Sequence, residues 1–245
     1  MIMGDIRSYA DYIDAIQKGE RDEDVILKLF FLKGIDDSYT AGYSEEALSA
    51  AGHRLMEILS DTNALHIIDI LDEESGSIKE IVTGGVPQFS EFDDVDKVLK
   101  ILQANEGCEF AYIGYMFNKN AREDAQYKYG ENHYKLCYQL GLVRWAGKAK
   151  KSKKAGLNYL GRIYLEYPEE ERECLRAKLC FRLPLIQKEL TEAKHGVIDG
   201  RQPMIDAGLS PSTVLRRRSS TKQMMRAISR ILPEKRDYTK NIKWF

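Results

Sequence analysis

Apolar residues recur at helical spacing in several stretches of the N-terminal half. Residues 44–59 begin with Ser44, a favourable N-cap, and continue with apolar side chains three and four positions apart. A further helix is predicted at 93–102. Nearer the N-terminus, helix-spaced apolar positions precede the apolar run 25–32, which suits either a buried strand or a buried helical turn.

Two short apolar segments in the same half have a different composition. Residues 65–71 and 78–82 are rich in isoleucine and valine, and a polar stretch around Gly76 separates them. This pattern favours a β-hairpin with a longer loop. We therefore expect residues 1–104 to form a small α+β unit.

The C-terminal half predicts short helices followed by a two-stranded hairpin. Gly141 suits a left-handed C-cap at the end of the third helix. The helices are expected at 110–117, 120–127 and 132–140 with a turn at 129–131, and the strands at 142–145 and 157–160 on either side of a tip at 147–156.

More helices follow the hairpin. One is expected at 161–167, and Pro168 opens another that runs to about residue 190. Ser210 and Pro211 suit the N-cap and first position of a third, and a separate helix is expected at 221–231. The predicted fold class is α+β, mainly helical, with a second domain at 105–232 and a C-terminal tail at 233–245.

Composition places the chain among folded proteins. Of its 245 residues, 43% are hydrophobic and 31% are charged, which excludes wholesale disorder. The longest apolar run, 111–117, is much shorter than the ~20 residues that cross a bilayer, so no membrane partner is expected. Residues 1–5 lack the basic start of a secretory signal, which predicts a cytoplasmic protein.

The near-zero net charge conceals an asymmetry between the two halves. Residues 1–100 hold 9 Lys and Arg against 22 Asp and Glu, whereas residues 101–245 hold 28 against 16. A basic half beside an acidic half points toward a nucleic-acid partner.

The order of helices, strand, basic tip and strand is typical of a winged helix-turn-helix. In such a module the third helix enters the major groove of DNA, and the hairpin tip contacts flanking phosphates. A lysine-rich tip that is merely solvated is the alternative. The side chains expected to face DNA from the third helix are His133, Tyr134, Lys135, Tyr138 and Gln139, and those from the tip are Lys148, Lys150, Lys151, Lys153 and Lys154.

A second basic site lies near the C-terminus. Arg216, Arg217 and Arg218 fall within one turn of a predicted helix, beside hydroxyl side chains that can also bind phosphates. One alternative is a charged helix face exposed to solvent. A nuclear localisation signal is the weaker alternative, because only three basic residues are consecutive.

Several motifs in this half carry a family resemblance. The sequences YGENHYKL at 129–136, LGLV at 140–143 and LNYLGR at 157–162 resemble a winged-helix module attached to many type II restriction endonucleases. LSPSTVLRRR at 209–218 is similar to the Ser-Thr-x-x-Arg-Arg stretch that closes that module. The resemblance covers about residues 105–231 and implies DNA binding in restriction or phage defence. It supplies no catalytic site and does not reach residues 1–100.

A metal-dependent nuclease needs clustered carboxylates and a lysine. The only Asp/Glu-x-Lys sequence is 192–194, at the end of a helical basic segment, where a surface ion pair is the simpler interpretation. Asp69 with Asp72, and the group 93–96, could hold a metal, but neither set has a lysine at the expected spacing, and an acidic surface is the simpler interpretation. The cysteine and histidine spacings predict no zinc site. No cofactor is therefore expected, except Mg²⁺ if the protein is a nuclease.

The sequence thus predicts a double-stranded DNA-binding protein, a regulator or targeting component in a defence system. The alternative is a type II restriction endonuclease with its active site in the acidic half. A third hypothesis is an interaction module whose acidic half mimics DNA and masks the basic half. Residues 1–104 are expected to mediate homodimerisation or to bind a partner protein.

Overall fold

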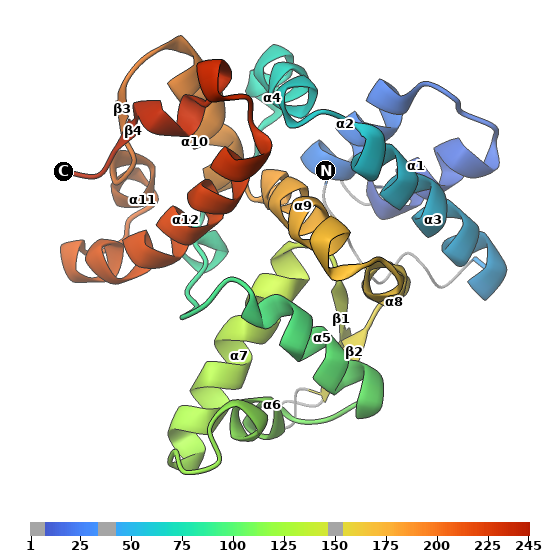
Figure 1. The fold of residues 1–245 in the computed structure, drawn as a ribbon, viewed down its shortest axis with the longest axis vertical. Coiled ribbons are helices and arrows are strands. Elements are labelled where there is room, and N and C mark those ends of the chain that lie inside the picture. The colour runs from blue at the N-terminus through green and yellow to red at the C-terminus, as the bar shows by residue number, and fades with distance from the viewer. Residues whose placement is uncertain (1–7, 34–42, 147–153) are drawn as a thin grey trace, which may run out of the picture.

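The computed structural model describes residues 8–33, 43–146 and 154–245, which are mainly helical (Figure 1). The described strands form two small two-stranded sheets. The elements are α1 (Ser8–Gln17), α2 (Glu23–Lys33), α3 (Glu45–Asp61), α4 (Ala64–Glu73), α5 (Asp94–Ala104), α6 (Phe110–Phe117), α7 (Glu123–Gln139), β1 (Val143–Ala146), β2 (Lys154–Leu157), α8 (Tyr159–Glu166), α9 (Glu169–Leu179), α10 (Pro184–His195), β3 (Ile198–Asp199), α11 (Gln202–Asp206), α12 (Pro211–Ile231) and β4 (Ile242–Lys243).

The N-terminal half is helical where the sequence favoured a hairpin. Ser44 caps α3 by accepting a hydrogen bond from the backbone of Ala47, which confirms that helix start. The apolar run 25–32 lies in α2 and is therefore helical. The hairpin predicted at 65–82 is wrong, because 65–71 lies in α4. Its buried side chains Ala64, Ile67, Ile68 and Leu71 recur at helical spacing behind an Asn63 cap, and this outweighs the β preference of isoleucine.

The turn predicted at 129–131 is also wrong, because α7 is one continuous helix. Gly130 lies buried in its middle, where a Cβ atom would sit 2.0 Å from the carbonyl oxygen of Phe110 in α6. At Gly114 of α6, a Cβ atom would likewise sit 1.9 Å from the carbonyl oxygen of Gln126. These glycines therefore allow the backbones of α6 and α7 to touch.

A hairpin after α7 is confirmed, but the second strand expected at 157–160 is wrong, because β2 ends at Leu157 and Asn158 caps α8 by accepting from the amide of Gly161. Gly141 ends the helix with φ of +81°, as its predicted C-cap role requires. β1 and β2 pair antiparallel, from Val143 opposite Leu157 to Ala146 opposite Lys154. The connection between these strands lies outside the described residues.

Three other predicted helices have different bounds. The single helix expected at 168–190 is divided into α9 and α10, because Pro184 cannot continue the preceding helix and instead begins a new one. Conversely, the two helices expected after Ser210 are one continuous helix, α12.

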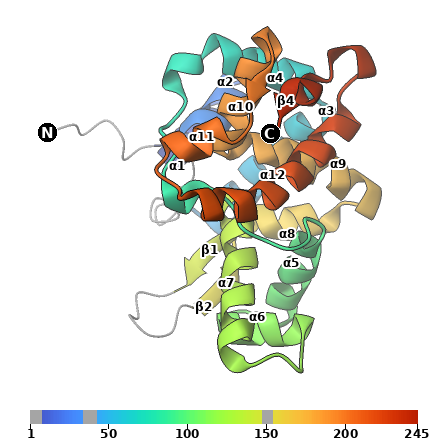
Figure 2. The same cartoon turned by 90° about the vertical axis from the view of Figure 1, so that its left-hand side faces the viewer.

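The main hydrophobic core does not divide at residue 104. One cluster of buried side chains runs from Tyr12 to Ile242 and includes residues of both halves. α5 packs against α6 and α7, and Figures 1 and 2 show these helices with β1 and β2 at one end of the molecule, beyond α1–α4 and α9–α12. None of the described helices is long and apolar enough to cross a membrane.

Candidate nucleic-acid interface

Two residues expected to face DNA from the third helix are buried instead. His133 and Tyr134 are 1% and 0% exposed, so the expectation that they project outward is wrong. The His133 ring stacks on Tyr129, with ring centroids 4.2 Å apart. The Tyr134 hydroxyl donates to the carbonyl oxygen of Arg144 and accepts from the amide of Gly156. Tyr134 thus joins α7 to the β1–β2 hairpin.

The remaining three predicted residues of this helix are partly exposed. The Lys135 side chain is 44% exposed and pairs with Glu131 at 2.9 Å. Gln139 donates a hydrogen bond to the carbonyl oxygen of Gly85, and Tyr138 packs against the core. Burial opposes ionisation of Glu131, but hydrogen bonds from Lys128 and Lys135 outweigh it and hold the pKa of Glu131 below its ordinary value. The outer face of α7 is therefore largely charge-compensated.

The three arginines at the start of α12 divide into two roles. Arg217 donates from Nη1 to the carbonyl oxygens of Thr83 and Val86, the latter at 2.8 Å. It therefore holds a loop rather than facing solvent. Arg216 is exposed and Arg218 is partly exposed, and neither forms an ion pair within the described parts of the chain.

The loop held by Arg217 also brings the two predicted sites together. Gln139 of α7 and Arg217 of α12 both bond to residues 83–86. Further along, Phe89 exchanges backbone hydrogen bonds with the hydroxyl of Ser220. Figures 1 and 2 show α7 and α12 on the same side of the molecule. The fold thus places the end of α7 beside the basic start of α12.

Sequence reasoning missed two cations further along α12. Lys222 and Arg226 follow the arginine run by one and two turns, and neither forms an ion pair with a described residue. Arg230, by contrast, pairs with Glu173 at 2.8 Å. The sequence does contain a sign of these residues, because the segment that forms α12 has six cationic side chains and no acidic one. The prediction of two separate helices obscured their common face.

The lysine-rich tip cannot be placed with these groups. Lys148, Lys150, Lys151 and Lys153 lie outside the described residues, and Lys154 is described only as the backbone at the start of β2. Its flanking strands fix where the connection begins and ends. Both strands are adjacent to α7 through Tyr134.

Acidic residues before and within α5 neutralise the two arginines of α9. Asp96 accepts from Arg172 at 2.7 Å and from Arg176 at 2.8 Å, and Arg176 also pairs with Asp93 at 2.6 Å. Asp94 accepts from the hydroxyl of Tyr129. The group 93–96, which the sequence offered as a metal site, is thus engaged by cations and a hydroxyl.

A second pair of acidic residues contacts a lysine that is distant in the sequence. Lys194 of α10 lies 2.8 Å from both Asp69 and Asp72 of α4, and His195 lies 2.8 Å from Asp72. Two carboxylates and a lysine lie together here, as a nuclease site requires. However, Lys194 forms an ion pair with both carboxylates, and His195 contacts one of them. Nowhere in residues 8–33, 43–146 and 154–245 do three or more His, Cys, Asp or Glu side chains form a group that could hold a metal ion.

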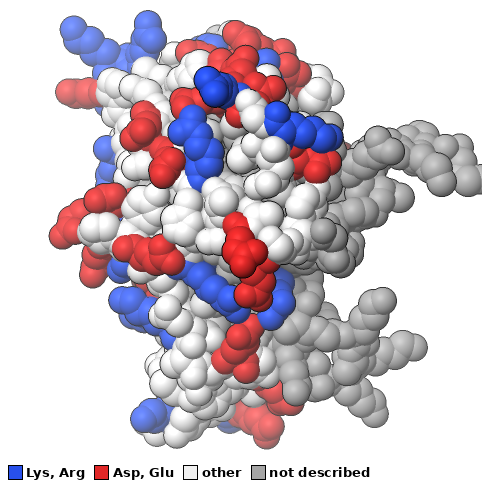
Figure 3. All heavy atoms as spheres, turned by 90° about the vertical axis from the view of Figure 1, so that its right-hand side faces the viewer, with Lys and Arg blue, Asp and Glu red and all other residues white. Residues whose placement is uncertain are grey.

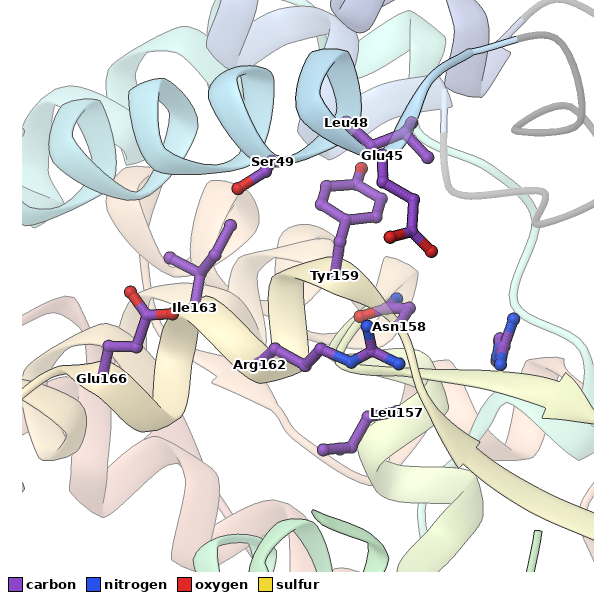
Figure 4. A pocket seen from close by; sticks show the side chains of 10 residues that line it. Glu45, Leu48, Ser49, Leu157, Asn158, Tyr159, Arg162, Ile163 and Glu166 are labelled. Carbon is purple, nitrogen blue, oxygen red and sulfur yellow. The ribbon is translucent and has the colours of Figure 1, made fainter. Parts of the chain in front are cut away.

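A pocket of about 470 Å³ lies between α3 and α8 (Figure 4). At its edge, Ser49 and Glu166 flank His53, which suggests a nucleophile and its base. However, the backbone carbonyl of Ser49 lies 2.9 Å from Nδ1 and Glu166 lies 3.1 Å from Nε2, and these contacts raise the pKa of His53. The Ser49 hydroxyl lies nearest Nδ1, and that nitrogen already donates its proton to the Ser49 carbonyl oxygen, so it cannot accept a proton from the hydroxyl.

Charges of both signs are intermixed on the face opposite α7 and α12 (Figure 3). That face therefore offers no extended cationic surface among its described residues.

A comparison of the chain with protein-family models, curated proteins and solved structures finds no match. Arg216, Arg218, Lys222 and Arg226 form no ion pair with a described residue, so the surface of α12 is the candidate interface.

Proposed function

We propose that the protein binds double-stranded DNA. The observation that carries the proposal is the distribution of charge. Acidic side chains pair with Arg172 and Arg176 of α9 and with Lys194 of α10, whereas only one of the six cations of α12, Arg230, forms an ion pair with a described residue. Duplex DNA carries one negative charge per ~1.7 Å of its axis, so such a surface is suited to it.

The arrangement around α7 supports the same proposal. Three helices, α5, α6 and α7, followed by β1 and β2 make the element order of a winged helix. The sequence prediction began one helix later, at α6, and divided α7 into two helices. In this proposal α7 is the helix presented to the major groove, with Asn132 on its outer face beside Lys128 and Lys135, which both pair with Glu131. The lysine-rich connection between β1 and β2 is the wing that contacts phosphates.

The biological role follows from the resemblance and is part of the proposal. A winged-helix module of this kind suits a regulator or targeting component in restriction or phage defence. The acidic half contributes charge partners to the basic half and offers a surface for a homodimer or a partner protein. The endonuclease alternative would require Mg²⁺ bound by carboxylates, and Asp69 and Asp72 are the nearest candidates.

A gel-shift experiment on duplexes of mixed sequence, with and without Mg²⁺, tests the proposal. We expect retarded but intact DNA in both conditions. Shortened DNA that appears only with Mg²⁺ would favour the endonuclease alternative. DNA that is neither retarded nor cut at low salt would contradict the proposed function.

A further inference from the structure

Three cations form a continuous stripe along α12. Arg218, Lys222 and Arg226 follow one another at intervals of four residues, which places them one above another on the same face of the helix. With a rise of 1.5 Å per residue, the stripe is about 12 Å long. Arg226 is exposed, and the other two side chains are partly exposed.

The stripe lacks neutralising partners in the described structure. α12 contains no Asp or Glu, and none of the three cations forms an ion pair with another described residue. The Lys222 ammonium group lies over the Trp244 ring, 5.8 Å from its centroid, which leaves its charge uncompensated.

This arrangement opposes helix stability. Like charges four residues apart destabilise a helix by roughly 0.2–0.5 kcal/mol per pair. Partial burial and repulsion from Arg218 and Arg226 lower the pKa of Lys222. An acidic residue at the middle position would have removed the repulsion. An anionic ligand removes it as well, so the stripe fits a polyanion better than it fits a stabilising role.

The neighbouring features limit where the anion lies. A hollow of about 310 Å³ between α9 and α12 is lined by Arg176, Arg226 and Arg230. Glu91, Asp93 and Glu173 line it too, and Asp93 pairs with Arg176 while Glu173 pairs with Arg230. Arg226 lies at the edge of this hollow without an ion pair to any described residue. Arg217, whose Nη1 donates to backbone carbonyl oxygens, is not part of the stripe. The cations that lack an ion pair therefore follow the stripe, and Arg226 is the point where the stripe meets the hollow.

We infer that Arg218, Lys222 and Arg226 bind phosphates along one strand of the DNA backbone. The opposite face of α12, with Ser220 and Met224, is buried in the protein, so this helix lies against the strand and does not enter a groove. The inference rests on the proposed function. It extends the predicted arginine run by two turns and adds Lys222 and Arg226 as phosphate-binding residues.

The test compares the salt dependence of duplex binding for the full chain and for Lys222→Gln/Arg226→Gln. Each phosphate contact contributes about 0.9 to the slope of log K against log salt, so the slope should fall by about 1.8. The melting temperature should stay the same or rise, because repulsion is removed. A control variant, Lys18→Gln/Arg21→Gln, changes two cations that follow α1 in the sequence and should leave the slope unchanged. Figure 1 shows α1 and α12 on opposite sides of the molecule.

The outcomes separate this inference from the proposed function. If the unmodified chain binds duplex and the Lys222→Gln/Arg226→Gln variant keeps the full slope, the phosphate assignment is wrong and the proposed function stands. An equal fall in slope for the control variant would also overturn the assignment, since the effect would then be one of overall charge. If the unmodified chain does not bind duplex at low salt, the inference and the proposed function both fail.

Discussion

Gly130 in the middle of α7 lies directly against the carbonyl oxygen of Phe110 in α6. A Cβ atom at Gly130 would lie 2.0 Å from that oxygen, far inside van der Waals contact. Gly130→Ala should therefore separate the two helices and lower the free energy of unfolding by about 1–3 kcal/mol, as overpacking does elsewhere. Urea denaturation measures this. Gly76→Ala is the matched control, because a Cβ atom there meets nothing within 4 Å; equal effects of the two substitutions would contradict the contact.

This glycine also shows what the sequence alone could decide. A glycine between two polar stretches reads as a turn, and only the packing of α6 against α7 shows that it is a contact within a helix. By contrast, residues 110–117 and the paired strands were predicted because their patterns are local: a short apolar run and two strands flanking a basic tip. The isoleucines of 65–71 favoured a strand, whereas their burial at helical spacing is decided by tertiary contacts.

The candidate site was partly predictable for the same reason. Arg216 and Arg218 are visible as a run of like charge, and Lys222 and Arg226 continue it once α12 is known to be one helix. The contact of Lys194 with Asp69 and Asp72 joins residues more than a hundred positions apart, so no spacing rule could reveal it. The burial of His133 likewise depends on the ring of Tyr129 being stacked on it.

Asp96 should be essential for joining α5 to α9. Its side chain is mostly buried and accepts from both Arg172 and Arg176. Asp96→Asn leaves two largely buried guanidinium groups without their shared carboxylate, and we expect a loss of about 3 kcal/mol in the free energy of unfolding. Asp124→Asn, which breaks the exposed pair with Arg122, should change stability by less than about 1 kcal/mol. A loss for Asp96→Asn no larger than for Asp124→Asn would refute the role assigned to Asp96.

His133 should make the protein acid-sensitive. Burial disfavours the charged ring and lowers the pKa of His133, although the Tyr129 carbonyl and Asp94 oppose the shift. The unfolded chain therefore takes up this proton first, near the ordinary histidine pKa of ~6.5, and stability present at neutral pH is lost as the pH falls below that value. His133→Phe should lose less stability than the unmodified protein between pH ~7 and pH ~5 in urea titrations. Parallel losses in the two proteins would show that His133 does not contribute.

Glu189 should lower stability at neutral pH. Its side chain is fully buried in α10, and neither carboxylate oxygen has a hydrogen-bond partner among the described residues. Burial, with a smaller contribution from Glu192, raises the pKa of Glu189 well above its ordinary value. The folded state thus favours the protonated form, so stability falls as the pH rises above ~4.3.

Replacement of Glu189 should consequently stabilise the protein. We expect Glu189→Met to raise the free energy of unfolding by at least about 1 kcal/mol at neutral pH and by less near pH ~4. The exposed substitution Glu170→Met serves as the control and should show no such pH dependence. A destabilised Glu189→Met variant at neutral pH would indicate that the carboxylate has a favourable partner in the folded protein.

The hairpin tip should contribute to DNA affinity independently of α12. Charge reversal of Lys151, Lys153 and Lys154 to Glu removes three cations of the proposed wing and introduces repulsion from phosphates. Duplex affinity at low salt should fall by at least about tenfold. Circular dichroism checks that the variant remains folded. Unchanged affinity would show that the tip is a solvated hairpin end and not a wing.

The most direct test of the account is equilibrium binding of the full chain to a fluorescent duplex of mixed sequence, measured by anisotropy at several salt concentrations. DNA binding through uncompensated lysines and arginines predicts clear association at ~50 mM salt, with affinity that falls steeply toward ~200 mM. A chain that leaves the anisotropy of the duplex unchanged at the lowest salt would contradict the central claim.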